Sequence, residues 1–285
     1  MTEIKRPPQN LDGLETRIEA LSRNVDRFYE NLTKAPALAL NIAQQSLQIT
    51  QWQLQLDPNA ERFETYSSLL VAARAGGALF EGANNTGEQF DYIIRTNITL
   101  TPIGPTHNHT PAAWLQALWT ATICRARNLV SDLCRTPDET LRAAGQYDEY
   151  IYAWIDALKA FFTNGEDLYE KINRSIELTD PARLTNSTPE IALLRYYPSM
   201  KLLFSLARRE SGQFNADLAE AVELHQRFWT ANNERLNSPD GFFAPGPTAL
   251  AAVARDLGIP IDVESEYLPR NFVNDFWVQT ADESS

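Results

Sequence analysis

His107 and His109 are the residues whose spacing most directly suggests chemistry. They stand two positions apart in the segment THNHTP, so both imidazoles can turn toward one metal ion. A stable zinc site needs three or four ligands, and only His225, Cys124, Cys134 or a carboxylate could complete it. Because the spacing supplies no third ligand, we expect neither a bound metal nor a cofactor. Replacing both loop histidines by alanine is expected to change stability by less than about 1 kcal/mol.

We predict a structural role for three further residues, namely the two cysteines and the third histidine. Cys124 and Cys134 are expected on one helix, about 15 Å apart at 1.5 Å per residue, which is too far for a disulfide. Neither belongs to a CxxC pair, so we expect buried free thiols. His225 continues an apolar stripe at helical spacing, and we expect a hydrogen-bonded histidine of the core rather than a catalytic base.

The common catalytic templates are missing from the sequence. It contains no GxSxG, no HExxH and no phosphate-binding loop. The glycines of ARAGGALF fall inside an expected helix and fit neither nucleotide-binding pattern. No catalytic residues are therefore predicted.

One acidic segment combines carboxylates with a tyrosine that could bind a protein partner. In YDEYIYAWIDALKAFF, residues 147 to 162, the large apolar residues form one helical stripe, which predicts a core face. The opposite face then carries Asp148, Glu149, Tyr152 and Asp156. Tyrosine is enriched at the energetic centres of interfaces, so Tyr152 is a candidate anchor. Single exposed aromatics are also common on ordinary surfaces, and this second interpretation stays open.

A second acidic patch with the same chemistry follows near the end of the chain. In DVESEYLP, the carboxylates Asp262, Glu264 and Glu266 precede Tyr267. Reversing two charges in either patch is expected to leave the fold intact and to slow association with a basic partner. These eight residues are the predicted interface candidates.

Composition and charge limit the classes of partner. The chain has 285 residues, is 44% hydrophobic, and carries 25 Lys and Arg against 37 Asp and Glu, a formal charge of −12. Such a charge repels phosphate backbones and anionic lipid, so neither nucleic acid nor a membrane is the expected partner, and a basic protein is favoured. The polar start and the lack of a long apolar run predict a cytoplasmic protein.

The elements that carry these residues are predicted to be almost all helical. Apolar spacing, caps and prolines indicate helices near residues 14–34, 36–57, 58–82, 111–135, 136–144, 147–162, 166–179, 189–210, 215–236 and 247–258. Short connections favour an all-α, multi-helical domain of antiparallel helical hairpins, with extended segments confined near 90–102 and 259–264. A close packing neighbour is expected at Gly76 and Gly77, because each glycine inside a helix costs about 1 kcal/mol relative to alanine.

Three motifs in order give the chain a family resemblance. YDEYIYAWIDALKAFF, FNADLAEAVELHQRFW and GIPIDVESEYLP, with the earlier LLVAARAGGALF, resemble the immunity protein 49 family of bacterial polymorphic toxin systems. The resemblance covers about residues 65 to 270. It suggests an immunity-49-like helical domain over 61–285, preceded by an N-terminal helical segment over 1–60 without matching motifs.

The resemblance implies a protein that binds and neutralises a cognate bacterial toxin. It carries over no catalytic residues, and the toxin could be basic, for instance a nuclease, given the charge of −12. Two alternatives remain. A helical adaptor would bind a peptide or protein in a groove between helices, and an uncharacterised helical enzyme would bring histidines and carboxylates together in a pocket.

Overall fold

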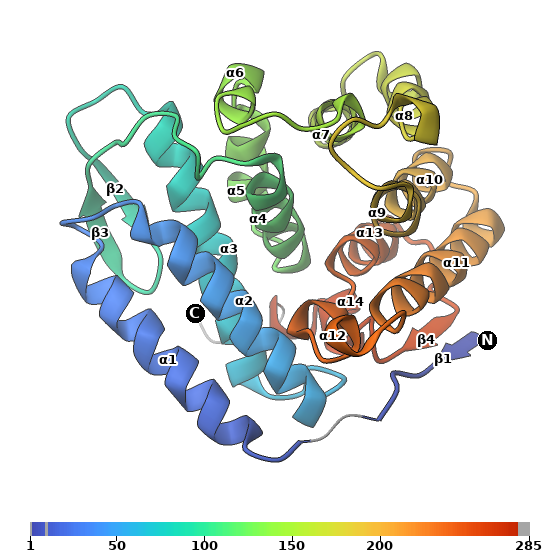
Figure 1. The fold of residues 1–285 in the computed structure, drawn as a ribbon, viewed down its shortest axis with the longest axis horizontal. Coiled ribbons are helices and arrows are strands. Elements are labelled where there is room, and N and C mark those ends of the chain that lie inside the picture. The colour runs from blue at the N-terminus through green and yellow to red at the C-terminus, as the bar shows by residue number, and fades with distance from the viewer. Residues whose placement is uncertain (1, 9–10, 279–285) are drawn as a thin grey trace. The chain divides into compact units, whose positions relative to one another are not determined.

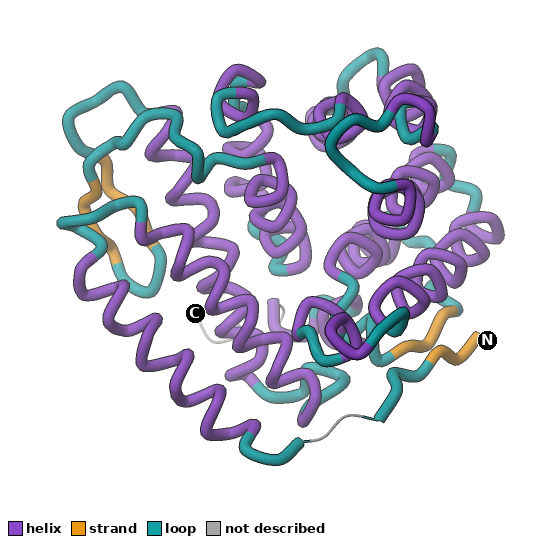
Figure 2. Tube along the Cα trace, in the orientation of Figure 1, coloured by secondary structure: helices purple, strands orange, loops and turns teal. Residues whose placement is uncertain are grey.

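The fold is almost entirely helical, as the sequence predicts. The structure is a computed structural model, and it describes residues 2–8 and 11–278. Helices account for 64% of the chain, with only short strands (Figures 1 and 2). Contacts divide the chain into two compact units, one of Met1–Gln9 with Gln146–Phe276 and one of Asn10–Gly145 with Trp277–Ser285. The boundary expected after residue 60 does not coincide with this division.

The unit built mainly from residues 10–145 packs its helices in chain order. The helix α1 contacts α2, α2 contacts α3, α3 contacts α4, and α5 contacts both α3 and α4 (Figure 1). Its helices are α1 (Leu14–Asn31), α2 (Leu38–Leu56), α3 (Phe63–Asn84), α4 (Pro111–Ile123), α5 (Arg127–Cys134) and α6 (Asp138–Arg142). The apolar repeat of α1 faces α2, with Leu14 and Val25 buried. This is the helical pairing that its spacing predicts.

The third helix begins later than Pro58 suggests. It starts at Phe63, because the buried Asp57 carboxylate organises the turn before it. Asp57 accepts hydrogen bonds from the backbone N–H groups of Glu61 at 2.8 Å and Arg62 at 2.9 Å, and from the Thr65 hydroxyl at 2.9 Å. Glu61 and Arg62 stand before the helix, so Asp57 fixes the turn that leads into α3, and its bond to Thr65 ties that turn to the first turn of the helix.

The single helix expected to carry both cysteines is two helices. The helix α4 ends at Ile123 and α5 begins at Arg127, and Arg125 between them has φ of 53°. This left-handed residue turns the chain without glycine or proline, so the break has no local sign in the sequence. Both cysteines are free thiols, Cys124 buried and Cys134 partly exposed.

The expected extended segment after α3 is a β-hairpin. Strand β2 (Phe90–Ile93) pairs antiparallel with β3 (Asn97–Leu100), with Phe90 opposite Leu100 and Ile93 opposite Asn97. Figure 2 shows it as the pair of orange strands beside α3. This confirms the prediction for residues 90–102.

The unit built mainly from residues 146–276 has its own helical core. In it α7 contacts α8, and α10 contacts α8, α11 and α13. Its elements are α7 (Glu149–Thr163), α8 (Leu168–Glu177), η1 (Pro181–Arg183), α9 (Pro189–Ile191), η2 (Ala192–Tyr196), α10 (Tyr197–Ala207), α11 (Ser211–Trp229), α12 (Asn233–Leu236), η3 (Pro239–Gly241), α13 (Pro245–Asp256) and α14 (Arg270–Val273). The element η2 is a π-helical turn, and the helical run continues without a gap from α9 through η2 into α10. Pro198, which has no N–H to donate, stands two residues after η2 within this run, so the widened turn lies where the α-helical bonding is interrupted.

Two strands from opposite ends of the chain pair within this unit. Strand β1 (Thr2–Ile4) runs parallel to β4 (Val263–Ser265), with Thr2 opposite Val263. The N–H of Arg6 donates to the Glu266 carboxylate at 2.9 Å, and the Arg6 guanidinium donates to the Phe242 carbonyl at 2.9 Å. The extended piece near 259–264 is therefore confirmed, whereas its partner β1 is not predicted from the sequence.

Among residues 2–8 and 11–278, no helix combines the length and the apolar character that crossing a membrane requires.

Candidate partner-binding groove

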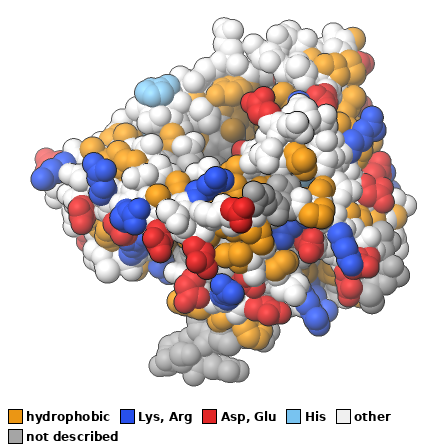
Figure 3. All heavy atoms as spheres, turned by 60° about the horizontal axis from the view of Figure 1, so that its bottom comes forward, with side chains coloured by type: hydrophobic (Ala, Val, Ile, Leu, Met, Phe, Trp, Pro, Cys, Tyr) orange, Lys and Arg blue, Asp and Glu red, His pale blue; other side chains and the backbone are white. Residues whose placement is uncertain are grey.

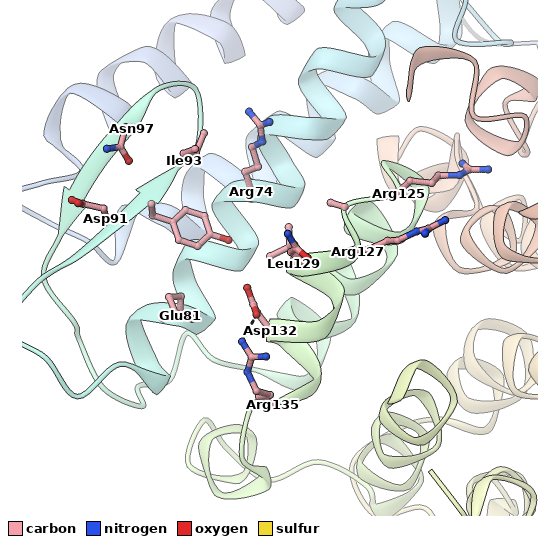
Figure 4. A pocket seen from close by; sticks show the side chains of 13 residues that line it. Arg74, Glu81, Asp91, Ile93, Asn97, Arg125, Arg127, Leu129, Asp132 and Arg135 are labelled. Atoms are coloured by element: carbon pink, nitrogen blue, oxygen red, sulfur yellow. Dashed lines mark hydrogen bonds and ion pairs between the residues drawn. The ribbon is translucent and has the colours of Figure 1, made fainter. Parts of the chain in front are cut away.

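A hollow lined by charged side chains lies within the unit of residues 10–145. It has a volume of about 840 Å³ and is bounded by α3, the β2–β3 hairpin and the α4–α5 connection with α5 (Figure 4). Asp91, Ile93 and Asn97 come from the hairpin, and Leu129 and Asp132 face them from α5. The walls come from segments that are separated in the chain and held together by packing.

Gly77 lets these walls approach one another. A Cβ atom placed on Gly77 would lie 2.1 Å from Leu129 Cδ1 and 2.2 Å from the Tyr92 hydroxyl oxygen. The hairpin and α5 therefore both rest on α3 where it has no side chain. At Gly76 a Cβ would lie 2.8 Å from the Cβ of Ala117 in α4. The expected close packing at the glycine pair is confirmed.

Hydrogen bonds hold the hairpin in place at its tip. Arg74 of α3 donates to the Ile94 carbonyl at 3.1 Å. From α1, Asp26 accepts a hydrogen bond from Arg95 at 2.6 Å, and the Tyr29 hydroxyl lies 2.8 Å from the Thr96 hydroxyl. The hairpin wall is thus tied to two helices.

Carboxylates border the hollow from three elements, although in Figure 4 the carboxylate of Asp91 points away from α5. Glu81 comes from α3, Asp91 from β2 and Asp132 from α5. Burial raises the pKa of the Tyr92 phenol well above its ordinary value, and the negative charges of Asp132 and Glu81 raise it further. Tyr92 is therefore a neutral hydroxyl at physiological pH, set between carboxylates.

The arginines that line the hollow differ in their bonding partners and in the direction of their side chains. Arg135 forms an ion pair with Asp132, and Arg74 is bound to the Ile94 carbonyl. In Figure 4 the side chains of Arg125 and Arg127 run away from the hairpin. The hollow is thus lined by both signs of charge, with four arginines and three carboxylates.

A second hollow of about 760 Å³ continues the first along α6. It shares Glu81, Asp132 and Arg135 with the first and adds Glu139 from α6. We call the two together the trough. Two local features of the sequence indicated this region, namely the glycine pair in α3 and the non-helical segment after it, but neither one indicated a binding surface.

The first predicted patch does not form an exposed surface. Tyr152 is only 5% exposed and Asp148 only 4%, so the expected exposure of both is wrong. Six consecutive residues of α7, Tyr150 to Ile155, are buried, and at 100° per residue they span its whole circumference. Asp148 instead accepts hydrogen bonds from residues 185 to 187. Glu149 is exposed and Asp156 partly exposed.

In the second predicted patch, two of the four residues are held within the fold and two are exposed. Tyr267 is 2% exposed and its ring lies 5.1 Å from that of His225, so its expected role as an exposed anchor is also wrong. Glu266 is bound to Arg6. Asp262 and Glu264 are exposed, and they stay candidates together with Glu149 and Asp156.

The histidines are hydrogen-bonded within the fold. The Nδ1 atom of the fully buried His109 accepts the Thr106 N–H at 2.9 Å, so its Nε2–H donates to the Leu79 carbonyl, 3.1 Å away. The small change in stability expected on replacing both His107 and His109 by alanine stays a prediction, but two hydrogen bonds in a buried site favour a larger loss. His225 Nε2 lies 3.1 Å from the Gly241 carbonyl, which confirms its predicted hydrogen bond. Within the described part of the chain, no three His, Cys, Asp or Glu side chains are grouped to hold a metal ion.

The surface charge is mixed in sign. On the face drawn in Figure 3, Lys and Arg side chains alternate with Asp and Glu. The formal charge of −12 is thus not expressed there as one continuous acidic area.

Comparison with known proteins gives one match. A family model described as immunity protein 49 matches residues 57–272, more than half of the chain. No curated protein and no solved structure matches the chain significantly. The matched region contains α3, the hairpin and all of the trough.

Proposed function

The chain belongs to the immunity protein 49 family, and we propose that it protects the cell that makes it by binding and neutralising one cognate toxin. The observation that carries this proposal is the family match over residues 57–272. The protein would act by occupying the toxin's working surface, as a non-catalytic inhibitor. It would do so in the cytoplasm, where a toxin that acts inside the cell reaches its target.

The charge of the chain supports a basic partner. A toxin that holds nucleic acid needs a positive surface for phosphate, and a chain with a formal charge of −12 is attracted to that surface. Complementary charge speeds association and helps to exclude wrong partners. A basic toxin domain, such as a nuclease, is therefore the partner we propose, and nucleic acid itself is not.

The proposal is tested with the toxin domain whose gene neighbours that of this chain. Co-expression of the two is expected to restore growth that the toxin alone stops, and the purified proteins are expected to form a complex in size-exclusion chromatography and calorimetry. A toxin domain from an unrelated system serves as the control. If the chain neither binds its neighbouring toxin nor restores growth, the proposed function is wrong.

A further inference from the structure

Each end of the chain belongs to the unit that does not adjoin it in the sequence. Residues 2–8 group with residues 146–276, although the unit 10–145 follows them directly, and Trp277 groups with the unit 10–145, although residues 146–276 precede it directly. Each unit is therefore an insertion in the other. We propose that the two ends act as straps that couple the stabilities of the two units. This inference does not depend on the proposed function.

The N-terminal strap, residues 2–6, is bound by more than the pairing of β1 with β4. The Ser265 hydroxyl donates a hydrogen bond to the Ile4 carbonyl at 2.6 Å, and the Ile4 side chain is 8% exposed. The side chain of Arg6 is 6% exposed, and its guanidinium donates to the Phe242 carbonyl. A side chain buried in this way holds its segment in a fixed position, so the strap is an ordered part of the unit 146–276.

The C-terminal strap is the side chain of Trp277. Its indole N–H donates a hydrogen bond to the Ala60 carbonyl at 2.8 Å. Its ring is stacked on that of the buried Tyr66, with ring centroids 6.3 Å apart, and meets the Phe63 ring edge-on at 5.6 Å. Aromatic pairs in these arrangements are favourable beyond the area that they bury. Trp277 therefore ties the end of the chain to the start of α3.

A bound N-terminal strap restricts the unfolded state of the unit 10–145. The chain leaves the unit 146–276 after the strap and returns to it at residue 146, so residues 10–145 form a loop whose two ends are held. If these residues unfold, the free energy of closing the loop rises with its length. A disulfide that closes a long loop stabilises a folded protein for the same reason. The unit 10–145 thus gains stability from contacts that belong to the other unit.

The same argument applies to residues 146–276, which Trp277 and residue 145 hold at their two ends. The gain is limited by the binding free energy of the strap, because a detached strap no longer closes the loop. Neither strap lies in the region 57–272 that the family model matches. The coupling is therefore a property of the ends of this chain, outside the matched region.

The first test alters the N-terminal strap and measures hydrogen exchange in the unit 10–145. Ile4→Asp with Arg6→Ala is expected to speed exchange in α2 and α3 at least about tenfold, because the unfolded state of that unit is no longer restricted. Glu3→Ala with Lys5→Ala is the matched control, since it alters the exposed side chains of the same strap. Exchange in the control should stay within about twofold of the unaltered protein.

The second test alters the C-terminal strap and measures exchange in the other unit. Trp277→Ala is expected to speed exchange in α10 and α11, which lie in the unit 146–276. Phe276→Ala removes the neighbouring aromatic side chain, which is 45% exposed, and is the control. Circular dichroism of each variant first shows that it is folded.

A third test leaves both straps unaltered. A protease site inserted between Leu11 and Asp12, which are both exposed, allows the loop to be opened by cleavage in the folded protein. Exchange in α2 and α3 is expected to be at least about tenfold faster after cleavage, because the cut removes the closure of the loop. The same protein before cleavage is the control, so the result does not depend on how a variant folds.

The outcomes separate coupling from local contacts. If each strap variant speeds exchange only in the unit to which its strap belongs, the straps are local contacts and the inference is wrong. If cleavage leaves exchange in α2 and α3 unchanged, loop closure contributes nothing and the inference is also wrong. Faster exchange in the opposite unit for both strap variants and after cleavage, with unchanged controls, supports the coupling.

Discussion

The carboxylate of Asp148 holds Thr185 by two hydrogen bonds, from its backbone N–H at 2.6 Å and from its hydroxyl at 2.7 Å. The N–H groups of Asn186 and Ser187 donate to the same carboxylate. Burial alone would raise the pKa of Asp148, but these donors outweigh it and lower the pKa to about 2. Asp148 therefore fastens the loop before α9 to the start of α7.

Asp148→Ala is expected to lower the free energy of unfolding by about 3 kcal/mol, because it leaves several N–H groups without their charged acceptor. Chemical denaturation followed by circular dichroism measures this. Asp262→Lys, at an exposed carboxylate of the same unit, is the control and should change stability by less than about 0.5 kcal/mol. Equal stability of the two variants would contradict the structural role of Asp148.

Gly77→Ala is expected to destabilise the protein by about 1 to 3 kcal/mol, because its Cβ would overlap Leu129 and Tyr92. Gly82→Ala in the same helix has its nearest neighbours at 3.7 Å and is the matched control. That change should raise stability by up to about 1 kcal/mol through helix propensity, and a similar gain for Gly77→Ala would show that the approach is not tight.

Stability is expected to fall as the pH drops from about 6.5 to 4, because burial lowers the pKa of His225 to about 4. In this window the unfolded chain, with an ordinary histidine pKa near 6.5, binds the proton more readily than the folded chain. Protonation therefore favours unfolding, by up to about 3 kcal/mol at the acidic end. Above pH 6.5 this contribution is fully present.

His225→Gln separates this effect from the titration of carboxylates. Glutamine can still donate to the Gly241 carbonyl, but it does not titrate. Denaturation midpoints between pH 4 and 7 should fall less steeply for the variant than for the unaltered protein. The same slope in both proteins would rule His225 out as the source.

Thiol labelling is expected to distinguish the two cysteines. Burial raises the pKa of Cys124 to about 12, so its reactive thiolate is scarce, whereas Cys134 is partly exposed. In the folded protein a disulfide reagent should modify Cys134 first and Cys124 only after denaturant is added. Mass spectrometry of the labelled peptides identifies the site, and rapid labelling of Cys124 in the folded protein would contradict its burial.

Periodicity predicted most helices because their apolar faces recur every three to four residues, as in α1. It failed on α7, where an apparent polar face is buried by residues distant in sequence. The same pattern of Asp148 and Tyr152 fits a solvated face or a buried hydrogen-bonded one, and only tertiary contacts decide between them. The break at Arg125 had no local signal, because a non-glycine residue adopts the left-handed conformation there.

The trough was beyond sequence reasoning for a related reason. Its carboxylates come from α3, β2, α5 and α6, and no spacing along the chain indicates that Glu81 and Asp132 border one hollow. The glycine pair predicted a close approach without naming Tyr92 or Leu129 as the neighbours. When packing brings distant residues together, the sequence shows the glycines that allow the close approach, but it does not show which residues meet there.

The pairing of β1 with β4 sets an order of events during synthesis. Thr2 leaves the ribosome about 260 residues before Val263, an interval of about 13 to 50 s at 5 to 20 residues per second. Through that time β1 has no strand to pair with. The residues of the trough all lie between 74 and 143, so they are complete when about half of the chain has been made. The hollow between the hairpin and α5 can therefore assemble on the nascent chain well before the last strand of the fold has been translated.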